Sequence, residues 1–268
     1  MNSLPSQILD RWWQVSGQTY FPNKPITNQI NRMNQTSINQ QLLDLYSSKW
    51  DKLSFELQSV HDNLELDIKP ANPLLLYVDD EVKYNESEIK IMIFGQETNG
   101  WFEEKDVSIE KLQILYDEFF NKGEAWTYGG QFWNGVNRLI KSLQQKYPEK
   151  KIKLIWNNTV KIGKKKEKGM PPDYIYEIER NFFRVIPQEV QILKPNIIIF
   201  FSGPNYDNII KDNFGEMNYQ TCSLFSSREL GMVEFPGVQN CFRTYHPNFL
   251  FRNNIDDYLE SIVESIKL

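Results

Sequence analysis

The sequence predicts an α/β protein: a three-layer α/β/α sandwich around a central four-stranded parallel sheet, preceded by an N-terminal helical segment. Three observations lead to this fold class. Four short apolar runs have the length of buried strands, helical apolar patterns separate them, and hydrophobic residues make up 40% of the 268-residue chain. Strands that alternate with helices are typical of a parallel sheet that helices cover on both faces.

The first 85 residues are expected to form the helical segment. Residues 5–15 have a strong apolar face with two tryptophans, and residues 28–60 carry apolar side chains at helical spacing. A pair of prolines near residue 70 marks the end of this pattern. We therefore predict an N-terminal helical segment over residues 1–85 and an α/β domain over residues 86–268.

The predicted α/β domain contains all four strands. The apolar runs cover residues 89–94, 152–156, 196–201 and 241–245. The helical patterns cover residues 108–121, 132–147, 174–193, 205–213 and 254–266. In sheets of this kind, ligands bind beyond the carboxyl ends of the strands, so the residues after each strand are the first place to look for a site.

Polar side chains follow each predicted strand. Glu97 comes after the first strand, Asn157 and Asn158 after the second, Ser202 after the third and His246 after the fourth. A single histidine is more often structural than catalytic. A carboxylate, an amide and a histidine at one edge of a sheet together favour a catalytic site.

The segments around these residues resemble three motifs of the uracil-DNA glycosylase superfamily. GQETNG (residues 95–100) resembles its water-activating GQDPYH motif, WNNTV (156–160) its base-reading LLNTV motif, and HPNFL (246–250) its HPSPL motif. They occur in the family's order, each after a predicted strand, and GQFWNGVNRL (130–139) is similar to a helix start in mismatch-specific members. The resemblance covers residues 88–266. It implies the family's fold and a DNA glycosylase that releases a pyrimidine and leaves an abasic site.

The resemblance also implies roles for individual residues. Glu97 matches the aspartate that orients the attacking water and stabilises positive charge on the sugar, and His246 matches the histidine that donates to O2 of the departing base. Asn158 matches the base-reading asparagine, because an amide offers one donor and one acceptor, with Asn157 as the alternative. Gln96 is expected near the base or a phosphate.

A second group of residues is expected to contact the DNA. Leu250 occupies the position of the family's wedge leucine, which fills the gap left by the flipped base, and Phe249 and Arg252 lie beside it. A basic run comes after the Asn158 motif, and near a site it favours phosphate contact over a solvated loop. The expected phosphate contacts are Lys164, Lys165, Lys166 and Ser202.

The residues after Glu97 bear on which base is removed. Where the family has a tyrosine that excludes C5 substituents, this chain has Asn99 followed by Gly100. A smaller residue opens that side, so we expect a C5-modified pyrimidine, such as a modified cytosine of phage DNA removed in antiviral defence, or uracil. Trp101 and Tyr128 are expected to line the base pocket. Trp126 and Phe132 are further candidates for the ring that stacks on the base.

Composition sets the remaining expectations. A net charge of −5 does not favour nucleic acid, although the local field near the site matters more than the total. Two cysteines cannot hold a four-cysteine iron–sulfur cluster, and we expect no metal and no cofactor. No apolar run approaches about 20 residues and no signal-like pattern opens the chain, so we expect a cytoplasmic protein without membrane contact. We also expect it to be a monomer.

Two other functions stay open. Glu in place of Asp moves the carboxylate outward by about 1.5 Å, and a displacement of about 1 Å can reduce a rate about 100-fold. The chain could therefore be a catalytically inactive DNA-binding module on the same fold. An unrelated α/β hydrolase that uses Glu97 and His246 is the third hypothesis, and it leaves the Asn158 and Leu250 matches as coincidences.

Overall fold

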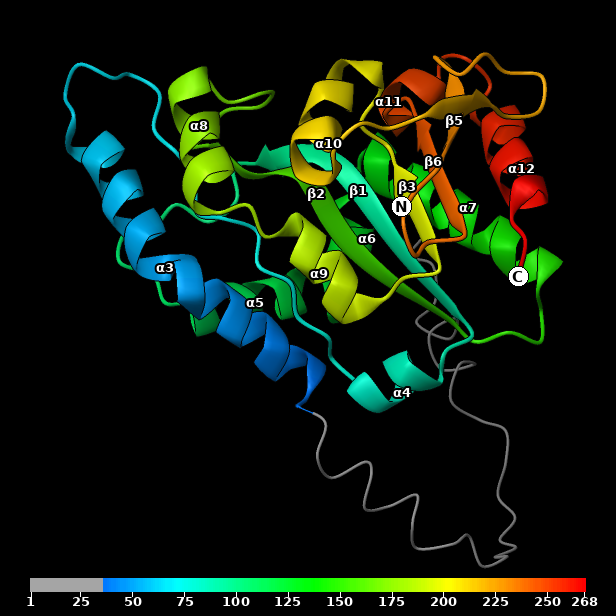
Figure 1. The fold of residues 1–268 in the computed structure, drawn as a ribbon, viewed down its shortest axis with the longest axis horizontal. Helices are drawn as coiled ribbons and strands as arrows, with labels where there is room; N and C mark the ends of the chain where they lie inside the picture. Colours follow the sequence, from blue (N-terminus) through cyan, green and yellow to red (C-terminus); the bar gives the residue numbers. More distant parts are fainter. Residues whose placement is uncertain (1–35) are drawn as a thin grey trace, which may run out of the picture. The chain divides into compact units, whose positions relative to one another are not determined.

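The computed structural model describes residues 36–268, so the helix expected over residues 5–15 lies outside the described residues. Ser37–Leu268 form one compact unit. At its centre is a twisted six-stranded sheet with helices on both faces (Figure 1). The fold class predicted from the sequence, α/β with a sheet between two helical layers, is therefore confirmed.

The sheet itself is larger than predicted, and it is mixed. Its strands are β1 (Ile89–Asn99), β2 (Ile152–Lys164), β3 (Ile197–Phe200), β4 (Tyr219–Thr221), β5 (Leu230–Val233) and β6 (Asn240–Thr244). Their spatial order is β2-β1-β3-β6-β5-β4. The four expected strands are β1, β2, β3 and β6, and they pair in parallel.

The two additional strands correct the prediction of a four-stranded parallel sheet. β5 pairs antiparallel with β6, and β4 pairs antiparallel with β5 at the edge of the sheet. Each has only three or four residues, and β4 is largely exposed. An exposed edge strand does not need a continuous apolar run, so no pattern in the sequence marked it.

Ten helices are present in residues 36–268. They are α3 (Ile38–Asp62), α4 (Glu81–Glu86), α5 (Ile109–Tyr116), α6 (Glu124–Tyr128), α7 (Gln131–Lys146), α8 (Asp173–Phe182), α9 (Ile186–Leu193), α10 (Asp207–Phe214), α11 (Pro247–Leu250) and α12 (Ile255–Ser265). A π-helical turn (Asp117–Asn121) extends α5, and a 3₁₀ turn (Pro204–Tyr206) precedes α10. The helix expected over residues 174–193 is divided into α8 and α9, and Pro187 lies in the first turn of α9.

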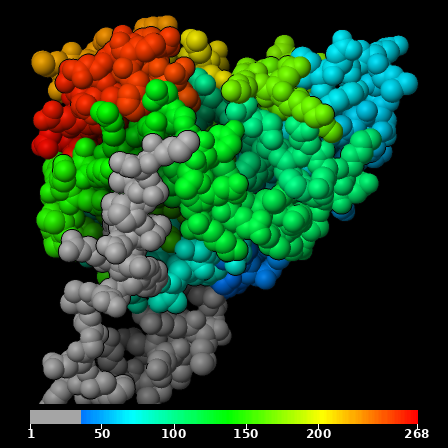
Figure 2. Space-filling model, turned by 180° about the vertical axis from the view of Figure 1, so that it is seen from behind, coloured from blue at the N-terminus to red at the C-terminus, as the bar shows by residue number. Residues whose placement is uncertain are grey.

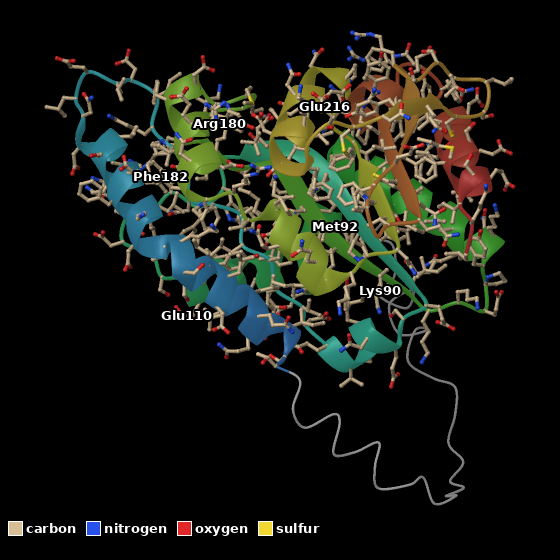
Figure 3. The ribbon with its side chains drawn as sticks, in the orientation of Figure 1. Lys90, Met92, Glu110, Arg180, Phe182 and Glu216 are labelled. Carbon is tan, nitrogen blue, oxygen red and sulfur yellow. The ribbon has the colours of Figure 1, made fainter. Side chains whose placement is uncertain are left out.

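Alternate residues of the central strands pack into two hydrophobic layers. Ile91 and Ile93 of β1 join the layer of α7 and α12, whereas Met92 and Phe94 join the layer that contains α3, α5, α8 and α9. Figure 3 labels Met92 on the face that α9 covers. Figure 2 shows the opposite face, where the orange and red C-terminal helices lie against the green of α7.

Helix α3 belongs to the same compact unit as the sheet, on the N-terminal side of the domain boundary predicted near residue 85. Its buried side chains, including Leu42, Tyr46 and Leu53, pack in the layer formed with α8 and α9. After the prolines the chain runs along the outer edge of β2, where the backbone N–H of Leu74 donates to the carbonyl of Lys161 at 3.0 Å. The prolines end a helical pattern, and the extended chain after them packs on the sheet.

Candidate functional site

Strands β1 and β2 continue beyond the apolar runs and carry two of the three motifs side by side. Gly95 pairs with Asn158 and Glu97 pairs with Val160, with an irregularity between Glu97 and Asn99. The motif residues therefore lie on strand ends rather than in free loops. This pairing fixes the spacing between the two polar segments at the carboxyl edge of the sheet.

The side chain of Asn158 lies against the backbone of Gly95. A β-carbon at position 95 would overlap Oδ1 of Asn158 and would also lie 3.4 Å from Cε2 of Phe132. Asn158 is only 2% exposed, yet its Nδ2 has no hydrogen-bond partner among the described residues. A buried amide donor without a partner is costly, and such a group often marks a place where a ligand binds.

His246 is held as a neutral hydrogen-bond donor. It caps the N-terminus of α11, and its Nδ1 accepts from the backbone N–H of Asn248 at 3.1 Å. Burial lowers the pKa of His246 to about 4. A neutral ring whose Nδ1 accepts carries its proton on Nε2. Within residues 36–268, this Nε2–H has no hydrogen-bond partner, so it is free to donate to a ligand.

Phe132, at the start of α7, joins these two groups. Its ring stacks on the imidazole of His246 with centroids 5.6 Å apart and an interplanar angle of 25°. The same ring lies beside Gly95, where Asn158 also packs. Phe132 therefore links His246 to Asn158 at the carboxyl edge of the sheet, and the three residues come from a helix and two non-neighbouring strand ends.

Among the described residues, the other aromatic candidates have no ring contact with Phe132 or His246. Trp101 packs against Trp156 with ring centroids 5.7 Å apart, and its indole nitrogen is buried without a partner among the described residues. Tyr128 is 64% exposed, and Trp126 packs on Trp133. The sequence motif at residues 130–139 was the signal for Phe132, but only the packing distinguishes it from the other rings.

Glu97 is held by a residue that the sequence did not point to. Its carboxylate accepts a hydrogen bond from the hydroxyl of Tyr206, in the 3₁₀ turn after β3. Burial raises the pKa of Glu97, and the hydrogen bond from Tyr206 and the backbone N–H of Gly169 partly oppose this. Among the described residues, Glu97 makes no direct hydrogen bond to Asn158 or His246. It lies two residues beyond Gly95, about 7 Å along the same strand.

The side chains of Gln96 and Ser202 point into the protein interior rather than towards solvent. Nε2 of Gln96 donates to the carbonyl of Ser202 at 2.8 Å. Ser202 is buried, and its hydroxyl has no partner in residues 36–268. In this conformation Ser202 cannot contact a phosphate of DNA. Asn99, by contrast, is exposed at the end of β1.

Leu250, which is expected to act as the wedge, is not exposed at the surface. Leu250 is fully buried in α11 and packs in the layer that contains Ile255 and Tyr258 of α12. The preceding residue, Phe249, is 38% exposed, and its ring lies 4.3 Å from that of Tyr245. On a helix, consecutive side chains point in different directions, so Leu250 is buried while its neighbour Phe249 is partly exposed. Arg252, just after α11, is exposed.

The basic run also divides into buried and exposed members. Lys161 is fully buried in an ion pair with Glu189, so it is not part of a solvated basic loop. Lys164 is mostly buried and lies 3.5 Å from the carboxylate of Glu167. Nζ of Lys165 donates to the carbonyl of Glu103, whereas Lys166 is exposed. Of the three lysines expected to contact DNA, Lys166 is the most accessible.

In the described part of the chain, no helix is both long and apolar enough to cross a membrane. Comparison of the chain with models of known protein families and with curated protein sequences finds no match.

Proposed function

We propose that this protein is a DNA glycosylase that hydrolyses the N-glycosidic bond of a flipped-out pyrimidine and leaves an abasic site. One observation carries the proposal. The ring of Phe132 contacts the imidazole of His246 and lies beside Gly95, where the side chain of Asn158 packs. At this carboxyl edge of the parallel strands, the Nδ2 of Asn158 and the Nε2–H of His246 have no hydrogen-bond partner among the described residues. A pyrimidine needs these three kinds of contact: a ring to stack on, an amide for its edge and a donor for O2.

In the proposed reaction, the bond between the base and C1′ of the deoxyribose breaks as water adds its oxygen to C1′. The electron pair of that bond leaves with the base, and negative charge develops on O2. Nε2–H of His246 stabilises this charge, and a donor is worth most at charge that appears only in the transition state. The carboxylate of Glu97 orients the water and accepts its proton. The base then takes up a proton from solvent.

The proposed substrate is a C5-modified pyrimidine, such as a modified cytosine of invading phage DNA, or uracil. Asn99 is exposed at the end of β1 and is followed by Gly100, which has a positive φ of 64°. Neither residue presents a bulky side chain that would reject a C5 substituent. Phe249, Arg252 and Lys166 are the exposed side chains we assign to DNA contact, and Phe249 replaces Leu250 as the proposed wedge.

A second function is favoured by the surroundings of Glu97. Its carboxylate is already engaged by Tyr206 and has no direct hydrogen bond to the other two polar groups in residues 36–268. This alternative requires that the carboxylate stays bound to Tyr206 and does not orient the attacking water. The alternative is therefore a DNA-binding module of the same fold that does not release bases.

Base release from defined DNA distinguishes the two functions. The panel contains duplexes and single strands with uracil, mismatched thymine, hydroxymethylcytosine or glucosylated hydroxymethylcytosine, and alkali reveals abasic sites. We expect breaks at one type of base, a loss of about 100-fold or more in Glu97→Gln and His246→Gln, and full activity in Glu104→Gln, which alters an exposed carboxylate. DNA binding without breaks at any base would reject the glycosylase and favour the binding module.

A further inference from the structure

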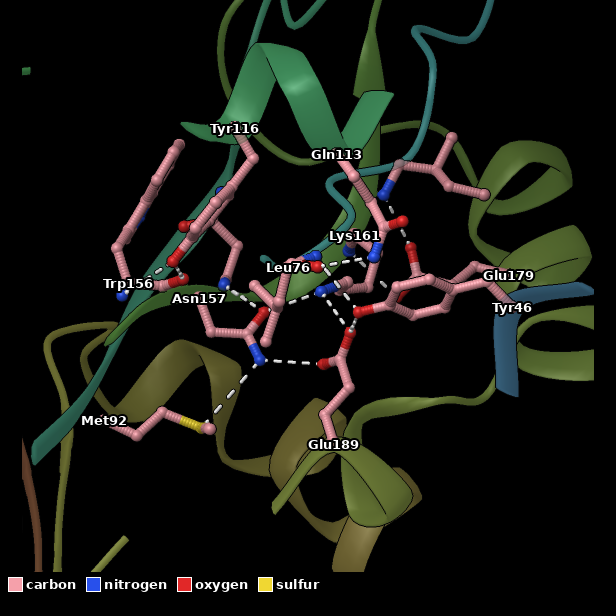
Figure 4. A network of polar contacts seen from close by, with 12 residues as sticks. Tyr46, Leu76, Met92, Gln113, Tyr116, Trp156, Asn157, Lys161, Glu179 and Glu189 are labelled. Atoms are coloured by element: carbon pink, nitrogen blue, oxygen red, sulfur yellow. Dashed lines mark hydrogen bonds and ion pairs between the residues drawn. The ribbon is translucent and has the colours of Figure 1, made fainter. Parts of the chain in front are cut away.

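A cluster of polar side chains lies on the face of β2 opposite to the Asn158 side chain, because consecutive residues of a strand point to opposite faces of the sheet. Its members are Tyr46 of α3, Asn157 and Lys161 of β2, and Glu189 of α9 (Figure 4). All four are fully buried. We call these four residues the buried polar cluster.

The hydrogen bonds of the cluster are short and complementary. Nζ of Lys161 donates to Oε1 of Glu189 and to Oδ1 of Asn157, each at 2.8 Å. Nδ2 of Asn157 donates to Oε2 of Glu189 at 2.9 Å, and the hydroxyl of Tyr46 donates to Oε1 at 2.7 Å. Charged groups on two sides of the Asn157 amide make these bonds stronger than neutral ones.

This arrangement permits only one orientation of the Asn157 amide. Oδ1 faces two donors, Nζ of Lys161 and the backbone N–H of Asn158 at 2.9 Å, whereas Nδ2 faces a carboxylate. A flipped amide would place its NH₂ group against the ammonium and its oxygen against Glu189. Asn157 is therefore occupied and cannot read a base, and it holds the backbone of the residue that can.

Stability alone does not account for the ion pair in this cluster. Removing an ammonium and a carboxylate from water is costly, and well-packed apolar residues of similar volume are often at least as stabilising. A buried pair does, however, hold its hydrogen-bond partners in one geometry. Here the partner is the peptide that carries Asn158, whose amide donor is unpaired in the described part of the chain.

We propose that Asn157, Lys161 and Glu189 are positioning residues, which hold the Asn158 backbone so that its side-chain amide meets the edge of the base in one orientation. This inference rests on the proposed function. The hydroxyl of Tyr46 donates to the carboxylate of Glu189 and so helps to hold it in place. Through this hydrogen bond, helix α3 takes part in base recognition without touching the base.

Asn157→Leu tests the proposal most directly, because it removes Oδ1 and leaves Lys161 paired with Glu189. A second variant, Lys161→Met with Glu189→Leu, replaces both charges by apolar groups and avoids an unpaired buried charge. Tyr84→Phe is the matched control. It removes another buried hydrogen bond in the same hydrophobic layer, from the Tyr84 hydroxyl to the carbonyl of Leu193, away from the site.

Two measurements decide the result. In free protein, hydrogen exchange of the Asn158 backbone amide, followed by NMR, should accelerate about tenfold in Asn157→Leu and stay unchanged in Tyr84→Phe. In base release, the preference for the best base over its nearest competitor should fall about tenfold in both cluster variants, with kcat reduced and KM for DNA little changed. A residue that only stabilises the fold would slow all bases equally.

Unchanged exchange at Asn158 and unchanged base preference in folded Asn157→Leu would overturn the proposal. If the wild-type protein releases no base at all, the proposed function fails. In that case the exchange measurement still decides whether the buried polar cluster holds Asn158.

Discussion

Gly95 leaves the space that the Asn158 amide occupies. A β-carbon there would overlap Oδ1 of Asn158 and would touch Phe132 at ordinary van der Waals distance. The φ of Gly95 is not in the positive region, so the requirement is one of space rather than of backbone conformation. Gly95 therefore connects β1 to the amide on β2 through close packing.

We expect Gly95→Ala to fold and to bind DNA, but to release base about 10- to 100-fold more slowly than the wild type. The added methyl group displaces the Asn158 amide by roughly 1 Å, and displacements of that size reduce rates by such factors. Base release and DNA affinity, measured on the same oligonucleotides, check this. An alanine variant with wild-type activity would show that the Asn158 amide does not contact the substrate.

His246 gives a prediction about pH. Burial lowers its pKa to about 4, below the ordinary value of 6.5, so the unfolded chain binds a proton that the folded protein does not accept between these values. The contribution of His246 to the free energy of unfolding is therefore fully present above pH 6.5 and is lost as the pH falls towards 4. We expect His246→Gln to remove this part of the pH dependence of unfolding.

The lowered pKa of His246 also predicts how base release depends on pH. Because the imidazole stays neutral, base release should show no inflection near pH 6.5 that arises from His246. Titration of the ring by ¹⁵N NMR, together with pH–rate profiles, tests this directly. A ring that titrates near pH 6.5 would contradict the neutral-donor role.

At the scale of elements, the short helix α11 carries a buried leucine directly after a partly exposed phenylalanine. Leu250 packs against α12, and Phe249 stands at the surface beside Tyr245. The chain runs from β6 through the His246 cap directly into this short helix. The position of the histidine and the direction of the two apolar side chains are therefore set by the same few residues.

Alanine substitutions at Leu250 and Phe249 should affect different properties, stability in one case and base release from duplex DNA in the other. Leu250→Ala leaves a cavity in the core and should lower the free energy of unfolding by about 2–5 kcal/mol, with little effect on DNA binding. Phe249→Ala should cost less than about 1 kcal/mol, but slow base release from duplex about tenfold while sparing single strands, since only a duplex needs a wedge. Denaturant titration and duplex-to-single-strand rate ratios measure both effects. If Leu250→Ala alone impairs the duplex reaction, the wedge is Leu250.

At the scale of the whole molecule, α3 and the segment along β2 form part of the core. A chain of residues 36–268 should therefore fold cooperatively, because it contains the complete compact unit. A chain of residues 86–268 should not, because it exposes the apolar surface that Leu42, Tyr46 and Leu53 cover and leaves Glu189 without Tyr46. Circular dichroism and thermal unfolding of both chains test this. Cooperative unfolding of the shorter chain would restore the boundary at residue 85.

Local patterns in the sequence were enough to predict the α/β class, the four parallel strands and the order of the polar motifs along the chain. An apolar run of about five residues identifies a buried strand, and the direction of the chain places the next residues at the carboxyl edge of the sheet. Asn158 and His246 could be chosen for the same reason, since each comes soon after such a run.

Packing between distant elements, which no local pattern contains, decides which of the neighbouring candidate side chains are buried or already hydrogen-bonded. The sequence left Asn157 open as the alternative to Asn158, but the Lys161–Glu189 ion pair occupies the Asn157 amide and leaves Nδ2 of Asn158 unpaired among the described residues. Phe132 is distinguished from the other aromatic candidates, and Phe249 from Leu250, in the same way. The short antiparallel edge strands and the place of α3 were also missed for this physical reason. Burial depends on the elements that pack against a segment, and those elements lie far away in the sequence.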